Sequence, residues 1–180
     1  IWWGQVLANP DFRQAHTDLW QELRENVFST VNIESVINDF ARQIDGRDPL
    51  GANAPALGRS PAERNFSKWG NTSHRNEVRI LKQWLRTRVG WIDRQYTAKP
   101  LFSALDGMKQ PGLVVAGDEF SFVGDGVIFY TTDGSDPRAS GGNSSPTALP
   151  SNSNDPIEIE GTATITARAR NGRGLTAWSG

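Results

Sequence analysis

The periodicity of the apolar residues changes near Pro100, and this change limits the fold more than any other feature of the sequence. Before Pro100, apolar residues recur every three or four positions, as on a helix; after it they alternate every second position, as on a strand. Residues 1–99 hold 14 Lys and Arg against 11 Asp and Glu, whereas residues 100–180 hold five against nine. We therefore predict an α+β chain of two domains, a helical segment over 1–99 and a β domain over 100–180.

The first half predicts several helices. Asn9 with Pro10 is typical of a helix start, and Ser60 with Glu63 has the spacing of a capping box. Between and after these starts, three apolar stripes with helical spacing are expected to face a core. The stripes are Phe12, Ala15, Leu19, Leu23 and Val27; Ile33, Val36, Ile37, Phe40 and Ile44; and Val78, Leu81, Leu85, Arg88 and Ile92, with Trp84 and Trp91 beside the last.

The second half predicts short strands. Residues 127–132 and 163–170 alternate between two faces, and the second run has Ile165, Ala167 and Ala169 on the apolar face and Arg168 and Arg170 on a solvated basic edge. Further strands are expected at 114–115, 119–122 and 157–159, and residues 139–155 are expected to form a long surface loop. Such strands in about 80 residues indicate a β-sandwich whose core is closed by Trp178 and which leans on the long helix through the run from Trp91 to Phe102.

The string Val127–Arg138, VIFYTTDGSDPR, resembles the C-terminal domain of chitobiases and β-hexosaminidases, and the similarity runs from about Pro100 to Gly180. That resemblance implies an immunoglobulin-like sandwich, an accessory domain without a catalytic residue. Within the string we expect a structural turn, in which Gly134 takes a positive φ, Asp133 and Asp136 accept backbone N–H groups, and Pro137 fixes the exit. The turn residues are Asp133, Gly134, Ser135, Asp136 and Pro137.

Residues 1–99 are similar to the end of the spore-coat protein H (CotH) kinase-like family, through NPDFRQAHTDLWQEL, Trp69 and EVRILKQWLRTRVGWIDRQY. This resemblance implies the last helices of a kinase-like fold, whose catalytic motifs lie upstream. The sequence has no glycine-rich loop, no His-Arg-Asp string and no Asp-Phe-Gly string. We therefore expect no enzymatic activity from this chain and no cofactor.

Other functional sites can be weighed from residue types. With two His and no Cys, a zinc site is not expected. Asp125, Asp133 and Asp136 could bind calcium, and Asp133 with Asp136 could act as an acid–base pair, but turn capping explains these carboxylates better. Trp2, Trp3 and Trp69 have no assigned core position and are candidates for ligand binding, for example by stacking on sugars. For Trp2 and Trp3 the alternative is an apolar surface that an upstream domain covers.

Charge and hydropathy limit the partners. The net charge of −1 and the acidic residues beside the basic ones on the long helix argue against a nucleic-acid partner, and no apolar run is long enough to span a membrane. The apolar start Ile1-Trp2-Trp3 suggests a piece of a longer protein. We expect a non-catalytic accessory part of a secreted or surface bacterial protein, with the sandwich as spacer or binding module. The alternatives are a carbohydrate or cell-wall binding module, and a part of an atypical kinase.

Overall fold

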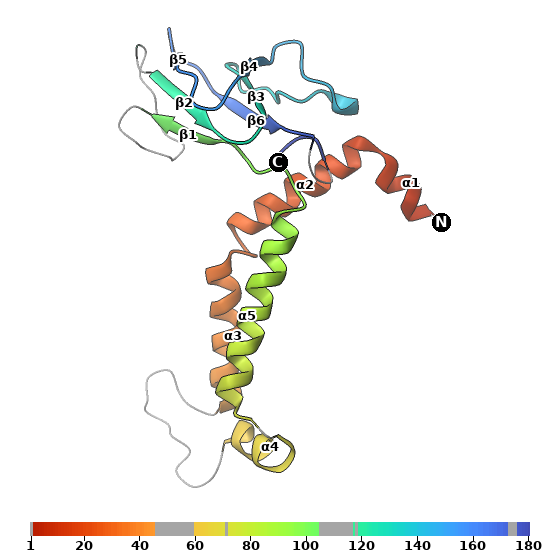
Figure 1. Ribbon diagram of the computed structural model, residues 1–180, viewed down its shortest axis with the longest axis vertical. Coiled ribbons are helices and arrows are strands. Elements are labelled where there is room, and N and C mark those ends of the chain that lie inside the picture. Colours follow the sequence, from red (N-terminus) through yellow and green to blue (C-terminus); the bar gives the residue numbers. More distant parts are fainter. Residues whose placement is uncertain (1, 46–59, 71, 105–116, 118, 173–175) are drawn as a thin grey trace. The chain divides into compact units, whose positions relative to one another are not determined.

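The computed structural model describes residues 2–45, 60–70, 72–104, 117, 119–172 and 176–180. It has the predicted α+β architecture, with helices followed by an immunoglobulin-like sandwich of antiparallel sheets (Figure 1). The chain forms two compact units, one of Ile1–Glu22 with Ile92–Gly180 and one of Leu23–Trp91. This division differs from a boundary at Pro100, because the first residues of the helical half group with the sandwich.

The helices begin where their capping residues predict. Asn9 Oδ1 accepts the backbone N–H groups of Asp11 at 2.8 Å and Phe12 at 3.2 Å, and Ser60 forms a full capping box with Glu63. The helices are α1 (Trp2–Ala8), α2 (Pro10–Glu25), α3 (Thr30–Asp45), α4 (Pro61–Trp69) and α5 (His74–Asp93). No helix in the described part of the chain is long and apolar enough to cross a membrane.

In the described residues, the sandwich consists of two three-stranded sheets. One has the order β1-β2-β5 and the other β4-β3-β6, and all pairs are antiparallel. After β6 the chain turns back, and Ser179 donates its backbone N–H to Ala169 O at 2.9 Å. The strands are β1 (Leu101–Ala104), β2 (Glu119–Val123), β3 (Val127–Thr131), β4 (Leu149–Ser151), β5 (Ile157–Glu158) and β6 (Thr166–Arg170), with a 3-10 turn η1 at Ser140–Gly142.

The expected loop over 139–155 and the expected strand at 114–115 differ in outcome from the other predicted segments. The expected loop over 139–155 contains β4, which pairs with β3, so it is not irregular throughout. The reason is that Leu149-Pro150-Ser151 can form an edge strand, the position in a sheet where proline is tolerated. The expected strand at 114–115 lies outside the described residues.

The core between the sheets is built mainly from phenylalanine and small aliphatic residues. Phe120 and Phe122 of β2 meet edge to face, with ring centroids 5.3 Å apart, against Ile128 of β3. Ala169 of β6 is fully buried there, and Ile165 and Ala167 pack against the cluster, as the alternation predicts. Strand β6 therefore presents Arg168 and Arg170 to the opposite, outer face of its sheet.

Trp178 is buried as predicted but on the other side of the sheet. It pairs with Arg170 beside β6, and its ring lies 5.1 Å from that of Phe129, on the outer face. The core between the sheets is formed without it, around Phe122 and Ile128. The expectation that Trp178 closes this core was wrong, because the pairing register places residue 178 on the same face as residue 170.

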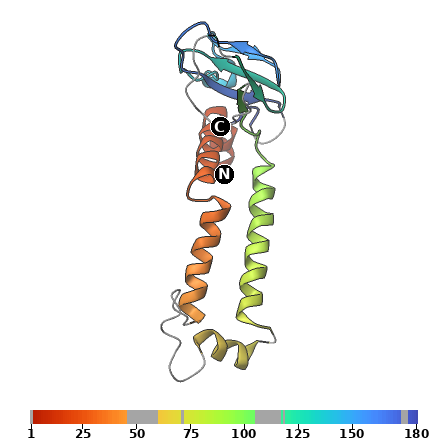
Figure 2. The ribbon, with the colours of Figure 1, turned by 90° about the vertical axis from the view of Figure 1, so that its left-hand side faces the viewer.

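In the unit Leu23–Trp91, α3 and α5 run antiparallel, and α4 lies at one end of the pair (Figure 2). Ile33 and Ile37 of α3 approach Leu85 and Val89 of α5. Most of the other residues in the predicted apolar stripes of α3 and α5 are exposed, which corrects the expectation that these stripes face a core: two paired helices share only one face. The exposed members include Val36, Phe40, Ile44, Leu81, Trp84 and Trp91.

Candidate functional site

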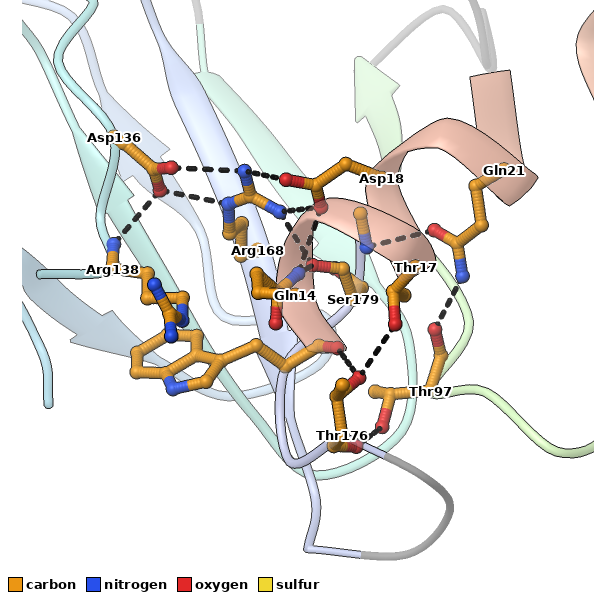
Figure 3. Close-up of polar contacts among 12 residues, drawn as sticks. Gln14, Thr17, Asp18, Gln21, Thr97, Asp136, Arg138, Arg168, Thr176 and Ser179 are labelled. Atoms are coloured by element: carbon orange, nitrogen blue, oxygen red, sulfur yellow. Dashed lines mark hydrogen bonds and ion pairs between the residues drawn. The ribbon is translucent and has the colours of Figure 1, made fainter. Parts of the chain in front are cut away.

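The most elaborate polar arrangement in the described residues lies where α2 covers the outer face of the β4-β3-β6 sheet (Figure 3). The buried residues of α2 are polar: Gln14 and Thr17. With Asp18 and Gln21 they follow the i, i+3, i+4, i+7 spacing of one helical face. The predicted stripe of α2 is on another face, and its members Phe12 and Leu19 are exposed. The expectation that this stripe packs into the core was therefore wrong.

Arg168 of β6 lies between two carboxylates, one from each side of this contact. Its Nε and Nη2 donate to Asp136 Oδ1 and Oδ2 at 2.7 and 2.9 Å, and its Nη1 donates to Asp18 Oδ1 at 2.7 Å. Nη1 also donates to Ser179 O at 2.6 Å. The planar guanidinium suits such two-pronged contacts. The side chain is only 13% exposed, so the expectation of a solvated basic edge at Arg168 was wrong.

The charge of Arg168 is fixed by its surroundings. Burial disfavours the charged form, but the hydrogen bonds to Asp136 and then Asp18 outweigh it, and the pKa of Arg168 is raised. The arginine is thus a permanent cation that pairs with one carboxylate from the helix and one from the sandwich.

The chain end and a segment after α5 complete the contact. Gln14 Nε2 donates to Ser179 O at 2.8 Å, and the hydroxyls of Thr17 and Thr176 lie 3.2 Å apart. Thr97, in the run where contact with the sandwich is expected, accepts at its carbonyl from Gln21 Nε2 at 2.8 Å (Figure 3). The sandwich was expected to lean on the long helix, α5. The helix that covers the outer face of its sheet is α2 instead.

A second ion pair fixes the start of α2. Arg138 Nη2 donates to Asp11 Oδ1 at 2.6 Å, and the backbone N–H of Gly141 donates to the same oxygen at 2.9 Å. The Arg138 hydrogen bond, followed by that of Gly141, holds the pKa of Asp11 below its ordinary value. A carboxylate in the first turn also suits the helix dipole.

The segment from Asp133 to Pro137 has the geometry of a capped turn. Asp133 Oδ1 accepts from the backbone N–H of Ser135 at 2.9 Å and from its hydroxyl at 2.6 Å, which lowers the pKa of Asp133. Gly134 has φ +80°, and Pro137 is fully buried. Asp136 Oδ1 accepts the backbone N–H of Arg138 at 2.9 Å. The turn therefore presents Asp136 to Arg168.

Asp133 and Asp136, two of the three carboxylates considered for calcium and both of those considered for acid–base chemistry, already have partners of this kind; the third, Asp125, is exposed. Asp133 bonds within its own turn, and Asp136 bonds Arg138 and Arg168. Within the described ranges, no group of three or more His, Cys, Asp or Glu side chains could hold a metal ion.

The candidate tryptophans are spread over different elements. Trp2 of α1 is 62% exposed and Trp69, the last residue of α4, is 76% exposed. The Lys68 ammonium lies 4.8 Å from the centre of the Trp69 ring. Trp2 and Trp69 belong to different compact units, and the side chain of Trp3 lies outside the described residues.

Sequence reasoning missed the residues that join α2 to the sandwich. The signal for Gln14, Thr17, Asp18 and Gln21 was a polar set at helical spacing, which is ordinarily a solvated face. The alternation does not distinguish Arg168 from Arg170, because both residues lie on the same side of β6.

Comparisons with known proteins give two family matches, one in each half of the chain. The family model described as CotH kinase protein matches residues 1–92, and the model described as chitobiase/beta-hexosaminidase C-terminal domain matches residues 120–177. No significant match was found among curated proteins or among solved structures. The helix α2 therefore lies in the CotH match, while Asp136, Arg138 and Arg168 lie in the chitobiase-type match. Since the first match covers just over half of the 180 residues, the chain belongs to the CotH kinase protein family and carries a chitobiase-type C-terminal domain.

Proposed function

We propose that this chain is a non-catalytic accessory region in which α2, a helix of the CotH match, holds the chitobiase-type sandwich in a fixed position against itself. The observation that carries the proposal is that α2 has two different faces. Its polar face, with Gln14 and Thr17, is buried against the sandwich, and its apolar face, with Phe12 and Leu19, is exposed. A helix of this kind can bind the sandwich on one side and a further protein surface on the other.

The second surface would be the catalytic part of a kinase-like protein, the upstream domain that the resemblance implies. The exposed apolar residues of α3 and α5 support this proposal, because proteins rarely leave contiguous apolar faces open to water. Val36, Phe40 and Ile44 recur every four residues on α3, and Trp84 and Trp91 are seven residues apart on α5. The spacing on α3 produces a continuous apolar face, whereas on α5 Arg88 lies between the two tryptophans.

The sandwich itself would serve for positioning. Carbohydrate binding is the alternative, and an exposed strip of aromatic rings would favour it. In the described part of the sandwich, Trp178 is only 2% exposed, lies against Phe129 and is covered by the Arg170 guanidinium. The large apolar residues exposed there are aliphatic, such as Val127 and Leu149. A stacking platform for sugar is thus poorly supported.

The absence of catalysis can be tested directly. The chain would be incubated with Mg–ATP and an acceptor protein, and separately with chitin oligosaccharides. We expect no turnover in either assay. Turnover that disappears on a single substitution in this chain, for example Asp136→Asn, would contradict the proposal.

Rigid positioning needs a distance measurement, and the chain contains no cysteine to interfere with labelling. Spin labels would be attached through Ala15→Cys on α2 and Leu149→Cys on β4, both exposed positions. We expect one narrow distance distribution, which Arg168→Met broadens and the neighbouring Arg170→Met does not. A broad distribution in the otherwise unchanged chain would show that α2 does not fix the sandwich.

A further inference from the structure

A second feature, independent of the sandwich, is an open hollow of about 920 Å³ on the helical unit, lined by residues of α3, α4 and α5. Its lining is strongly basic, with five Arg and Lys against two carboxylates. The basic residues are Arg42, Arg75, Arg79, Lys82 and Arg86, and the acidic ones are Asp45 and Glu63.

Four of these cations come from one face of α5. Residues 75, 79, 82 and 86 are spaced by four, three and four positions, which places their side chains above one another along about 16 Å of helix. Arg42 of α3 adds a cation from the other helix. The result is a line of positive charge rather than a single point.

Only part of this charge is neutralised. Arg86 pairs with Glu34, and Arg42 pairs with Asp39. In contrast, Arg79 Nη2 donates to the Asn76 side-chain oxygen at 2.9 Å, and Lys82 donates to that of Asn38. Among the described residues, no carboxylate lies within ion-pair distance of Arg75, Arg79 or Lys82; Glu34 is near enough to Lys82 for the lysine charge to help Arg86 lower the pKa of Glu34.

The two carboxylates of the hollow have other partners. Glu63 accepts the backbone N–H of Ser60 at 3.0 Å in the capping box, and Asp45 Oδ1 accepts from the Ser60 hydroxyl at 3.4 Å. These neutral partners leave both carboxylates charged, but five basic side chains against two acidic ones still give the lining a net positive charge, which attracts a ligand with several negative groups.

We propose that this hollow binds an extended peptide that carries phosphoryl groups on alternate residues. Alternate side chains of an extended strand are about 6.6 Å apart, close to the rise of about 6 Å between helical residues four apart. Arginine suits phosphate because its guanidinium donates two hydrogen bonds in one plane. The side-chain amides of Asn38 and Asn76, also in the lining, suit a peptide backbone.

A nucleic acid fits the hollow less well. Single-stranded nucleic acids are held by aromatic rings that stack on the bases, and the described lining holds no Trp, Tyr or Phe. The exposed Trp84 is nine residues from Arg75, a rotation of about 180° around α5. For the same reason, a partner that covers the apolar face of α5 would leave the basic face open, so this inference does not depend on the proposed function.

The test uses the whole 180-residue chain and a fluorescein-labelled nine-residue Gly/Ser peptide with phosphoserine at three alternate positions. Fluorescence anisotropy would be measured at 50 and 300 mM NaCl. We expect binding that weakens with salt, and little binding of the unphosphorylated peptide. Arg79→Ala should weaken binding about tenfold, the loss expected for one charged hydrogen-bonding partner.

The matched control is Arg88→Ala, also an exposed arginine of α5 but on the opposite face, above the Trp91 ring. It should leave the affinity unchanged, and circular dichroism should show equal helicity in both variants. Equal losses in the two variants, no binding of the phosphopeptide, or equally tight binding of a single-stranded DNA or of inorganic polyphosphate with the same charge would each overturn the proposal.

Discussion

Replacement of Arg168 by Met tests whether the contact between α2 and the sandwich stabilises the unit to which both belong. Methionine keeps an unbranched apolar stem but removes five hydrogen bonds, two to Asp136, two to Asp18 and one to Ser179 O. Removing one partner of a fully buried ion pair costs about 3–5 kcal/mol, whereas an exposed pair contributes about 0–1 kcal/mol.

The ion pairs of Arg168 are neither fully buried nor fully exposed, so their contribution lies between these limits. The arginine side chain is 13% exposed, but those of Asp18 and Asp136 are 39% and 46% exposed and can regain water. We therefore expect a loss of about 2–3 kcal/mol in the free energy of unfolding. For a unit of about 110 residues this corresponds to a fall in Tm of about 8–12 °C.

The assay is thermal unfolding at pH 7, followed by circular dichroism in the β region and by calorimetry. Arg170→Met is the matched control, because Arg170 is on the same face of β6 but exposed. Its guanidinium lies 5.1 Å from the Trp178 ring centre, a contact that contributes about 0.5–1 kcal/mol, or roughly 2–4 °C. Equal Tm values for the two variants would refute the reasoning that Arg168 joins helix and sheet.

Three further predictions concern the turns, the pH dependence and the helix. Gly134→Val should destabilise the unit by about 1–3 kcal/mol in urea unfolding, because Gly134 has φ +80°. Gly126→Ala should destabilise it by about 2–4 kcal/mol, because Gly126 also has φ +80° and a Cβ there would lie 2.5 Å from Arg170 O. Gly141→Ala, with similar φ but open space, should lose only about 1 kcal/mol, and an equal loss at 126 would contradict the close contact. The folded-state pKa of Asp11 is lowered, so the contribution of its carboxylate to the free energy of unfolding is complete above about pH 4 and is lost as the pH falls through that lowered pKa. Asp11→Asn should therefore make Tm fall less steeply with acid. An unchanged profile of Tm against pH would refute this. Residues 100–180 alone should melt below the full chain, because they lack α2, and an unchanged Tm would show that α2 does not support the sandwich.

Much of the fold could be predicted from local patterns. The Asn9 and Ser60 helix starts, the inward Ala167 and Ala169, and the positive φ of Gly134 follow from short-range chemistry that the sequence displays directly. The apolar stripes on α3 and α5 were identified as stripes, but the assumption that they lie in a core was wrong. Periodicity reports that a face is apolar; it does not report whether the described chain supplies the surface that covers it.

The contact between α2 and the sandwich illustrates why the remaining features could not be predicted. Ordinarily the apolar face of a helix is buried and its polar face is exposed, yet α2 buries Gln14 and Thr17 and exposes Leu19. The polar face can be buried only because it finds partners that are distant in the sequence: Asp18 meets Arg168, 150 residues away, and Gln14 meets Ser179, 165 residues away. Each buried polar group would be costly alone and is stabilised by a partner that no local window contains. Arg168 in turn requires Asp136, whose position depends on the turn that begins at Asp133. The short string that marks the chitobiase-type domain thus has a role beyond its own turn, since it supplies the carboxylate that holds Arg168 against the helix.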